Sequence, residues 1–399
     1  MSPVPQRARR RLAYLVSHPI QYQAPLLSRL AGCDEVDLDV AFLSDVSTRK
    51  HFDPGFGASF AWDVPLTEGY ACRFLSSAPK VSFWSPFLPD IWQRIDGEGI
   101  DALWVHGWNQ ATQLIAIAEA TRRGIPVLLR GESKPEARRG LVRKAVLKTL
   151  LQRVAACLAI GTENRLFYEQ LGVGQERIYP VPYGVDNEHF ERGARSAAQH
   201  REDSMRELGL DPARPVILFA SKLIERKRPL DLVEAYRRLT RFGNEAEDAH
   251  RAQLVIVGDG PLRAAVEKAA RGPGWGSIHV LGFRNQSELP RLYELSDVFV
   301  LPSAYETWGL VVNEAMCAGT PVIASDGVGC ARDLIREGET GFTYPVGDVE
   351  ALARCLQRVL EDRPRAHAMG QRAAAHVRRF GIDAACDGIL NAVAEVCAV

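Results

Sequence analysis

Short apolar, β-rich runs alternate with helical patterns in two successive series along this chain of 399 residues. The first series predicts strands at 12–17, 36–44, 102–106, 127–130 and 157–160, with helices at 111–123, 137–153 and 163–171. The second predicts strands at 216–221, 254–257, 278–281, 298–301 and 322–324, with helices at 229–241, 261–270, 288–296 and 310–317. Such alternation is typical of parallel sheets covered by helices on both faces. The sequence therefore predicts an α/β protein with two doubly wound, Rossmann-like domains.

Length supports this division, because 399 residues are too many for one ordinary core. We expect an N-terminal domain over 1–190, a C-terminal domain over 191–380, and a last helix over 381–399 that packs back on the N-terminal domain. Residues 191–214 are polar and rich in arginine and alanine, which favours an interdomain connection with one short helix. Ligands of open α/β sheets bind at the carboxyl ends of the strands, so the site is expected in a cleft between two facing domains.

Composition argues against several other classes of protein. The 49 lysines and arginines balance 49 aspartates and glutamates, so we expect no nucleic-acid partner. The eight cysteines are scattered without a Cys-x-x-Cys pair, which indicates a reducing compartment and neither a disulfide scaffold nor a zinc site. No apolar stretch approaches the roughly 18–20 residues of a membrane span, and the run at 12–17 is too short for a signal peptide. A cytoplasmic protein is expected.

The most informative segment, 303–319, reads Ser-Ala-Tyr-Glu-Thr-Trp-Gly-Leu-Val-Val-Asn-Glu-Ala-Met-Cys-Ala-Gly. A buried strand is predicted to end just before it, and a helix to begin near Gly309. Amide groups at a helix start carry a partial positive charge that suits a phosphate group. Glu306 precedes that start, and Glu314 lies about one and a half turns inside, among apolar residues where a carboxylate needs partners such as a ribose diol. Either glutamate alone is explained as a dipole partner or a solvated residue, whereas the pair favours a binding site.

This segment resembles the glutamate–seven residues–glutamate motif of retaining GT-B glycosyltransferases of glycosyltransferase family 4, the glycosyl transferases group 1. The resemblance is strong over about 180–350 and mostly architectural over 10–180. It implies the GT-B fold, with an acceptor-side domain over 1–190 and a nucleotide-sugar-binding domain over 191–380, and it implies no cofactor. It also implies that Glu306 lies beside the donor sugar and that Glu314 binds the ribose. The other donor-binding candidates of this segment, with backbone amides near the sugar or diphosphate, are Thr307, Trp308, Gly309 and Leu310.

Residues 221–229 read Ser-Lys-Leu-Ile-Glu-Arg-Lys-Arg-Pro, and resemble the family's arginine–leucine…lysine segment with Lys222 in place of the usual arginine. By itself this segment is also explained as a solvated basic turn. With the glutamate motif downstream, Lys222 and Lys227 become candidates to neutralise a diphosphate leaving group. We therefore expect no metal, and Asp37-Leu38-Asp39 is poorly placed to hold one because it lies inside a predicted strand. The resemblance adds four donor-site candidates: Gly258 and Gly260 in a turn that lines the donor site, and Phe283 and Arg284 as contacts of the nucleobase. By itself, the Gly-x-Gly turn is also explained as an ordinary turn between a strand and a helix.

The N-terminal half departs from the family pattern in two places. A glycine-rich loop is replaced by Ser17-His18-Pro19-Ile20-Gln21-Tyr22, and Leu129-Arg130-Gly131-Glu132-Ser133 holds no histidine where many relatives have one. His106, at the end of another predicted strand, is the nearest substitute, and either a structural or a catalytic role fits it. The catalytic candidates are thus Glu306, Lys227, Lys222 and His106. The acceptor-side candidates are His18, Gln21, Arg130 and Glu132.

The resemblance implies a retaining, hexosyltransferase-type enzyme that moves a sugar from a nucleotide diphosphate sugar to a sugar or lipid-linked acceptor, in surface polysaccharide or glycoconjugate synthesis. Two alternatives stay open: a nucleotide-sugar epimerase of the same fold, and a catalytically inactive partner protein that binds a sugar nucleotide. Residues 138–153 form a basic, amphipathic pattern, which predicts peripheral contact with the inner face of a membrane. The same apolar stripe is equally explained as packing on the N-terminal sheet.

Overall fold

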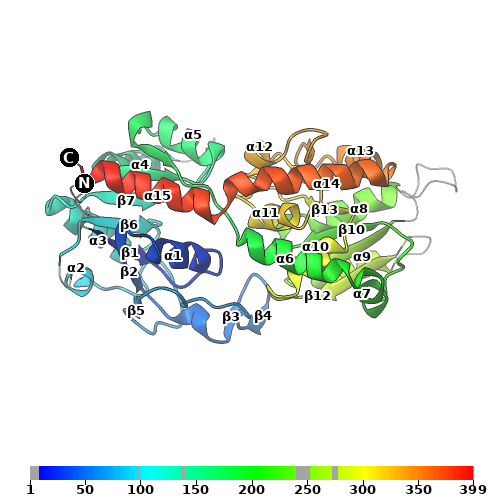
Figure 1. Ribbon diagram of the computed structural model, residues 1–399, viewed down its shortest axis with the longest axis horizontal. Helices are drawn as coiled ribbons and strands as arrows, with labels where there is room; N and C mark the ends of the chain where they lie inside the picture. Colours follow the sequence, from blue (N-terminus) through cyan, green and yellow to red (C-terminus); the bar gives the residue numbers. More distant parts are fainter. Residues whose placement is uncertain (1–8, 97–98, 136–139, 240–251, 272–276, 399) are drawn as a thin grey trace, which may run out of the picture. The chain divides into compact units, whose positions relative to one another are not determined.

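The computed structural model describes residues 9–96, 99–135, 140–239, 252–271 and 277–398. The chain divides into two compact units, each built from more than one stretch of sequence (Figure 1). Unit 1 comprises Met1–His51, Val64–Tyr183 and Ile382–Val399, and unit 2 comprises Phe52–Asp63 and Gly184–Gly381. The boundary near residue 183 lies seven residues before the expected one. The assignment of Phe52–Asp63 to unit 2 was not expected.

Unit 1 contains a seven-stranded, parallel sheet in the order β5-β2-β1-β6-β7-β8-β9. Its buried central strands are runs of apolar residues, as expected for a sheet covered on both faces. The strands are β1 (Arg10–Val16), β2 (Val36–Phe42), β5 (Cys72–Phe74), β6 (Ala102–His106), β7 (Val127–Arg130), β8 (Ala156–Ala159) and β9 (Ile178–Pro180).

Helices cover both faces of this sheet. On the face toward the viewer in Figure 1, α1 (Ala24–Ala31) and α15 (Ile382–Val396) share one core with the strands. A second core holds the remaining helices of unit 1: α2 (Ile91–Ile95), α3 (Ala111–Arg122), α4 (Leu141–Arg153) and α5 (Thr162–Gln170). At the carboxyl ends of the strands, loops lead into the helices. Polar side chains such as His106 and Glu132 lie there.

Unit 2 contains a six-stranded, parallel sheet in the order β12-β11-β10-β13-β14-β15. The strands are β10 (Val216–Ala220), β11 (Gln253–Val257), β12 (Ile278–Gly282), β13 (Val298–Leu301), β14 (Val322–Ser325) and β15 (Gly341–Tyr344). The helices are α6 (Asn187–Ala198), α7 (Arg201–Glu207), α8 (Pro229–Leu239), α9 (Arg263–Ala270), α10 (Leu289–Glu294), α11 (Leu310–Cys317), α12 (Ala331–Leu334), α13 (Val349–Leu360) and α14 (Arg363–Val377). Apolar residues of α8, α9 and α13 pack on the strands in one continuous core.

The expectation that residues 191–214 form an interdomain connection with one short helix is wrong. They lie mostly in α6 and α7, and α6 begins at an N-cap where the Asp186 carboxylate accepts a hydrogen bond from the His189 amide. Phe190 and Met205 are buried. The Phe190 ring packs on Tyr293 of α10, which in turn packs on Phe299 of β13. Arg192, Arg195 and Arg206 are exposed on these helices, whereas Arg201 donates hydrogen bonds to the carbonyls of Glu294 and Leu295.

The two remaining strands, β3 (His51–Asp53) and β4 (Ala58–Phe60), pair with each other in a sheet of their own. The turn between them is fixed by Asp53, whose Oδ1 accepts hydrogen bonds from the amides of Gly55 (2.7 Å) and Phe56 (3.1 Å). We call residues Phe52–Asp63 the β3–β4 hairpin. The hairpin contacts other residues of unit 2, and several of those residues are candidate site residues.

Candidate functional site

Lys227 and Glu306 form a buried ion pair in unit 2. Lys227 ends a 3-10 turn that follows β10, and Glu306 lies in the loop between β13 and α11. Because β10 and β13 are neighbours in the sheet, their carboxyl ends bring the two loops together. The Lys227 Nζ lies 2.6 Å from the Glu306 Oε1, and each residue is only 8% exposed. Burial lowers the pKa of Lys227, while the charge and hydrogen bond of Glu306 oppose this effect.

Backbone contacts hold the Glu306 loop at the start of α11. The Ala304 amide donates to the carbonyl of Arg226 (2.8 Å), and the Glu306 amide donates to the carbonyl of Gly327 (3.0 Å). Gly309 is the N-cap of α11, with a φ of 108° that favours glycine. The predicted order of strand, glutamate loop and helix start is therefore present, and a helix start of this kind suits an anion.

Glu314 lies inside α11 and is completely buried. Its Oε2 accepts a hydrogen bond of 2.6 Å from the hydroxyl of Tyr293 on α10. The alternative that Glu314 is a solvated residue is therefore wrong. Its role in binding a ribose stays a prediction, because the contact that the structure gives its carboxylate is a phenol. Trp308 is likewise buried, and its Nε1 donates a hydrogen bond to Asn313 Oδ1 (2.9 Å). Because the side chain is engaged in this way, we expect Trp308 to contact a ligand through its backbone.

The Gly258–Gly260 turn follows β11 and lies against the loop that carries Lys222. A Cβ atom on Gly258 would lie 1.9 Å from the carbonyl oxygen of Ser221, so only glycine permits this approach. Gly258 and Gly260 also have φ values of 136° and 148°. The Leu223 amide donates to the Asp259 carbonyl at 2.8 Å and joins the two loops. The structure thus brings the turn and Lys222 to one edge of the sheet.

Lys222 and Phe283 both contact the β3–β4 hairpin. The Lys222 Nζ lies 2.9 and 2.8 Å from the two carboxylate oxygens of Asp53, and 4.7 Å from the centre of the Phe56 ring. Phe283 packs against Phe56 and Phe60. Sequence reasoning missed the hairpin, because nothing in its residues marks it as part of a site in the second half of the chain. Arg284, the adjacent candidate, pairs with Glu288 at 3.6 Å.

A second polar cluster lies at the carboxyl ends of the strands of unit 1. His106, at the end of β6, is buried, and its Nδ1 lies 3.1 Å from the Tyr14 hydroxyl. Its Nε2 lies 3.2 Å from both the Glu132 Oε1 and the Tyr183 hydroxyl, and that hydroxyl also donates to Glu132. Burial lowers the pKa of His106 despite the neighbouring carboxylate. Burial acts to raise the pKa of Glu132, but the hydrogen bond and charge of His106 outweigh it and lower that pKa.

Arg130, another acceptor-side candidate, is enclosed. It is 1% exposed and donates to the carbonyls of Val181 (3.2 Å) and Pro182 (3.3 Å), and its guanidinium lies over the Tyr183 ring. In the structure this side chain supports Tyr183, and its role toward an acceptor stays a prediction. Sequence reasoning missed Tyr183, because it lies 77 residues from His106 along the chain and no local pattern signals the contact.

The other two acceptor-side candidates are less enclosed. Gln21 is half-buried in the loop after β1. His18 is also half-buried, and burial together with the charges of His51 and His106 lowers its pKa to about 4. Among the described residues, no group of three or more histidines, cysteines, aspartates or glutamates is arranged to hold a metal ion. Over the same part of the chain, every helix is too short or too polar to span a membrane.

Comparison with known proteins gives matches centred on unit 2. Residues 200–376 match the family model described as glycosyl transferases group 1. The D-inositol 3-phosphate glycosyltransferase of Nocardia farcinica is 33% identical over 236 residues, which cover 57% of this chain and 50% of that protein. The chain spans about half the length of the curated relatives it matches. Every donor-site candidate lies inside the matched region, and every acceptor-side candidate lies outside it.

Solved structures resemble the whole chain. Sucrose-phosphate synthase of Thermosynechococcus elongatus has a TM-score of 0.72 at 20% identity, and the likeness covers 98% of this chain and 100% of that one. HepE of Anabaena, in complex with UDP, has a TM-score of 0.72 at 16% identity, over 96% of this chain and 100% of that one. The predicted GT-B fold, with two Rossmann-like α/β units, is confirmed by these likenesses and by the two parallel sheets.

Proposed function

We propose that the protein is a retaining glycosyltransferase of family 4 that transfers a hexose-type sugar from a nucleoside diphosphate sugar to a sugar or lipid-linked acceptor. The observation that carries the proposal is the buried Lys227–Glu306 pair beside the start of α11. A buried ion pair costs desolvation energy that an apolar pair would avoid, so its presence favours a functional site. The matched family and the binding of UDP by HepE support the same donor class.

In this mechanism unit 2 stabilises the departing diphosphate. Glycosyl transfer passes through an oxocarbenium-like state in which negative charge develops on the leaving phosphate. Lys227 supplies a cation in a site with little water, where its effect on that charge is strong, and the amides at the start of α11 supply hydrogen bonds. Glu306 keeps Lys227 charged and in place. The acceptor attacks from the face that the diphosphate leaves, and a phosphate oxygen takes the acceptor's proton, so no separate base is required.

Unit 1 then binds the acceptor through Glu132. The Glu132 side chain is 41% exposed, and its carboxylate can accept a hydrogen bond from a sugar hydroxyl. His106 and Tyr183, both buried, hold that carboxylate from behind. His106 is thereby a positioning residue in this proposal. The acceptor belongs to surface polysaccharide or glycoconjugate synthesis.

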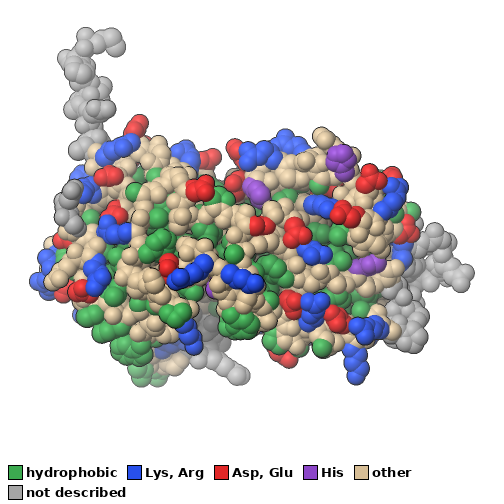
Figure 2. Space-filling view, turned by 90° about the horizontal axis from the view of Figure 1, so that it is seen from below, with side chains coloured by type: hydrophobic (Ala, Val, Ile, Leu, Met, Phe, Trp, Pro, Cys, Tyr) green, Lys and Arg blue, Asp and Glu red, His purple; other side chains and the backbone are tan. Residues whose placement is uncertain are grey.

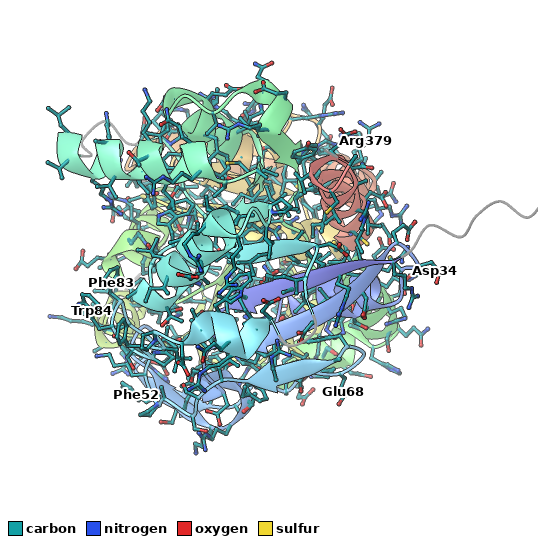
Figure 3. The ribbon with its side chains drawn as sticks, turned by 90° about the vertical axis from the view of Figure 1, so that its left-hand side faces the viewer. Asp34, Phe52, Glu68, Phe83, Trp84 and Arg379 are labelled. Atoms are coloured by element: carbon teal, nitrogen blue, oxygen red, sulfur yellow. The ribbon has the colours of Figure 1, made fainter. Side chains whose placement is uncertain are left out.

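Contact with a membrane is part of the proposal. On α4, Leu147 and Leu151 pack in the core of unit 1, while Leu141, Val142 and Val146 are 85%, 79% and 62% exposed. The helix also exposes Arg143, Lys144 and Lys148, whereas Arg138 and Arg139 lie outside the described residues. Figure 3 shows Phe83 and Trp84 on the same side of unit 1 as α4, and both rings are exposed. Exposed apolar side chains among cations suit an anionic lipid surface.

The deciding experiment combines donor binding with product analysis. Thermal unfolding is followed with UDP-, GDP- and ADP-sugars, since a ligand at 100 times its dissociation constant stabilises by about 2.7 kcal/mol. The stabilising donor is then incubated with and without glycan acceptors, and the anomeric configuration of the product is read by NMR. A new glycoside with the donor's configuration is expected. An inverted glycoside refutes retention, an isomerised donor sugar indicates the epimerase, and donor binding without turnover or hydrolysis indicates the inactive partner protein.

A further inference from the structure

The β3–β4 hairpin is inserted in the sequence of unit 1, yet its contacts are with unit 2. Two hydrogen bonds anchor its β4 end: Asn285 Nδ2 donates to the Ala61 carbonyl (2.8 Å), and Ser287 Oγ donates to the Asp63 carboxylate (2.5 Å). Both partners lie in the loop between β12 and α10, directly after Phe283 and Arg284. The hairpin is therefore held at the loop that would contact the nucleobase.

At its other end the hairpin neutralises Lys222. The Asp53 carboxylate meets the Lys222 ammonium with both oxygens, while the Gly55 and Phe56 amides fix Asp53 Oδ1. The Phe56 ring covers the same ammonium at 4.7 Å. A carboxylate that receives a lysine ammonium and two backbone amides is held as a donor phosphate would be.

The hairpin also covers the glycine turn and the Phe283 ring. A Cβ atom on Gly260 would lie 2.9 Å from the carbonyl oxygen of Gly55, so the two backbones are close to contact. The centre of the Phe283 ring lies 5.0 Å from that of Phe56 and 4.5 Å from that of Phe60. A base that stacked on Phe283 would need the space that these rings occupy.

We propose that the β3–β4 hairpin competes with the donor inside its own site: Asp53 takes the place of a phosphate on Lys222, Phe56 and Phe60 take the place of the base on Phe283, and nucleotide binding opens the hairpin. This inference rests on the proposed function and on the prediction that Lys222 and Phe283 bind the donor. A diphosphate beside Lys222 would meet the Asp53 carboxylate, and the two anions repel each other. The β4 end, bonded to Asn285 and Ser287, is the hinge. Only molecules with an open hairpin can bind the nucleotide. The apparent affinity for the nucleotide is therefore lowered in proportion to the fraction of open molecules.

Hydrogen–deuterium exchange of the full chain, with and without saturating UDP, GDP or ADP, tests the inference. Peptides from Lys222–Lys227 and from α11 report donor binding, and peptides from Phe52–Asp63 report the hairpin. We expect slower exchange in the first set and faster exchange in the second, for at least one nucleotide. Protection of the donor-site peptides with an unchanged or slower hairpin overturns the competition and leaves the donor site standing. No protection with any of the three nucleotides overturns both.

Substitution of Asp53 gives a second, independent measurement. Asp53→Asn removes the charge from the hairpin and should tighten the nucleotide's dissociation constant by about three- to tenfold, measured by calorimetry. Phe56→Ala should act in the same direction without any change of charge. Asp45→Asn is the matched control, because Asp45 pairs with Arg49 on the surface of unit 1. Equal or weaker nucleotide binding by both hairpin variants, with native circular dichroism, refutes the inference.

Discussion

At the residue scale, Lys227 has surroundings unlike those of an ordinary surface lysine. It lies at the carboxyl end of a strand, is nearly enclosed, and meets a single carboxylate at 2.6 Å. Removal of one preorganised charge contact to a developing oxyanion commonly costs about 2.7–4 kcal/mol, or a factor of 100 or more in rate. We expect Lys227→Ala to reduce transfer by about that factor, in a steady-state assay with the identified donor.

Lys268 provides the matched control for this experiment. It is an exposed lysine on α9 of the same unit, so Lys268→Ala should transfer at the wild-type rate. Circular dichroism establishes that both variants fold. A folded Lys227→Ala enzyme with near wild-type transfer contradicts the donor-site assignment.

The lowered pKa of His18 predicts how the stability of unit 1 depends on pH. The unfolded chain takes up a proton at this histidine near its ordinary pKa of about 6.5, whereas the folded chain does so only near about 4. Between these values stability falls as the pH is lowered, by at most about 1.4 kcal/mol per pH unit from this group. The drop in thermal midpoint from pH 7 to pH 5 should thus be smaller in His18→Gln than in wild type. A drop of equal size in His18→Gln and in the exposed-histidine control His200→Gln contradicts the shifted pKa.

The sequence predicted the positions of some site residues and not the contacts of others. The positions of Glu306 and Lys227 were predictable, because their motifs follow strands that are adjacent in the sheet. The phenol of Tyr293 on Glu314 and the enclosure of Arg130 were not, because each depends on a helix or strand distant in the sequence. A Glu314→Ala variant therefore reports on the fold as well as on the donor, since it leaves the buried Tyr293 hydroxyl without this acceptor.

At the element scale, several strands and helices were predicted to within a residue or two, whereas α1, α13 and α14 were not predicted. β6, β7, β13 and α11 have the predicted bounds, because apolar runs flanked by turn residues fix both ends. β5, β9 and β15 were missed. β5 and β9 are three-residue strands with no buried residue, and β15 contains glycine and threonine, so none of the three has an apolar run. The β3–β4 hairpin has only three residues per strand, and its partners lie some 170–230 residues away, which local pattern cannot reveal.

The exposed face of α4 gives the prediction that belongs to this scale. Flotation with vesicles of phosphatidylglycerol and phosphatidylcholine should carry the protein upward at low salt, and much less at high salt, because screening weakens the attraction. Combined Leu141→Ser, Val142→Ser and Val146→Ser substitutions should abolish flotation. Leu230→Ser with Val346→Ser, at apolar residues exposed on unit 2, is the control. Equal partitioning into neutral vesicles, or none into either kind, contradicts membrane contact.

At the scale of the whole molecule, positive and negative charges balance in number. Figure 2 shows lysine and arginine side chains interspersed with aspartate and glutamate on the face it displays, in keeping with 49 residues of each sign. In the proposed function, an anionic donor is therefore attracted by a few cations at the carboxyl ends of the strands of unit 2, and not by the net charge. The sequence balance alone could not have located them.

The same cations lead to a prediction about metals. Because Lys227, Lys222 and the start of α11 supply the positive charge for a diphosphate, we expect transfer to proceed at an undiminished rate after dialysis against EDTA. Initial rates are compared before dialysis, after it, and after addition of Mg²⁺ or Mn²⁺. A strict dependence on either ion contradicts the role given to these cations.

The place of α15 governs the order in which the protein can fold during synthesis. Ile389 and Val393 of this helix lie in the same core as Leu12 and Trp104, so that core is incomplete until residue 396 has left the ribosome. All of Gly184–Gly381 is made in the interval, which takes roughly 10–40 s at usual elongation rates. Unit 2, although second in the sequence, can finish first. The nascent N-terminal half meanwhile presents an apolar face that α15 has yet to cover.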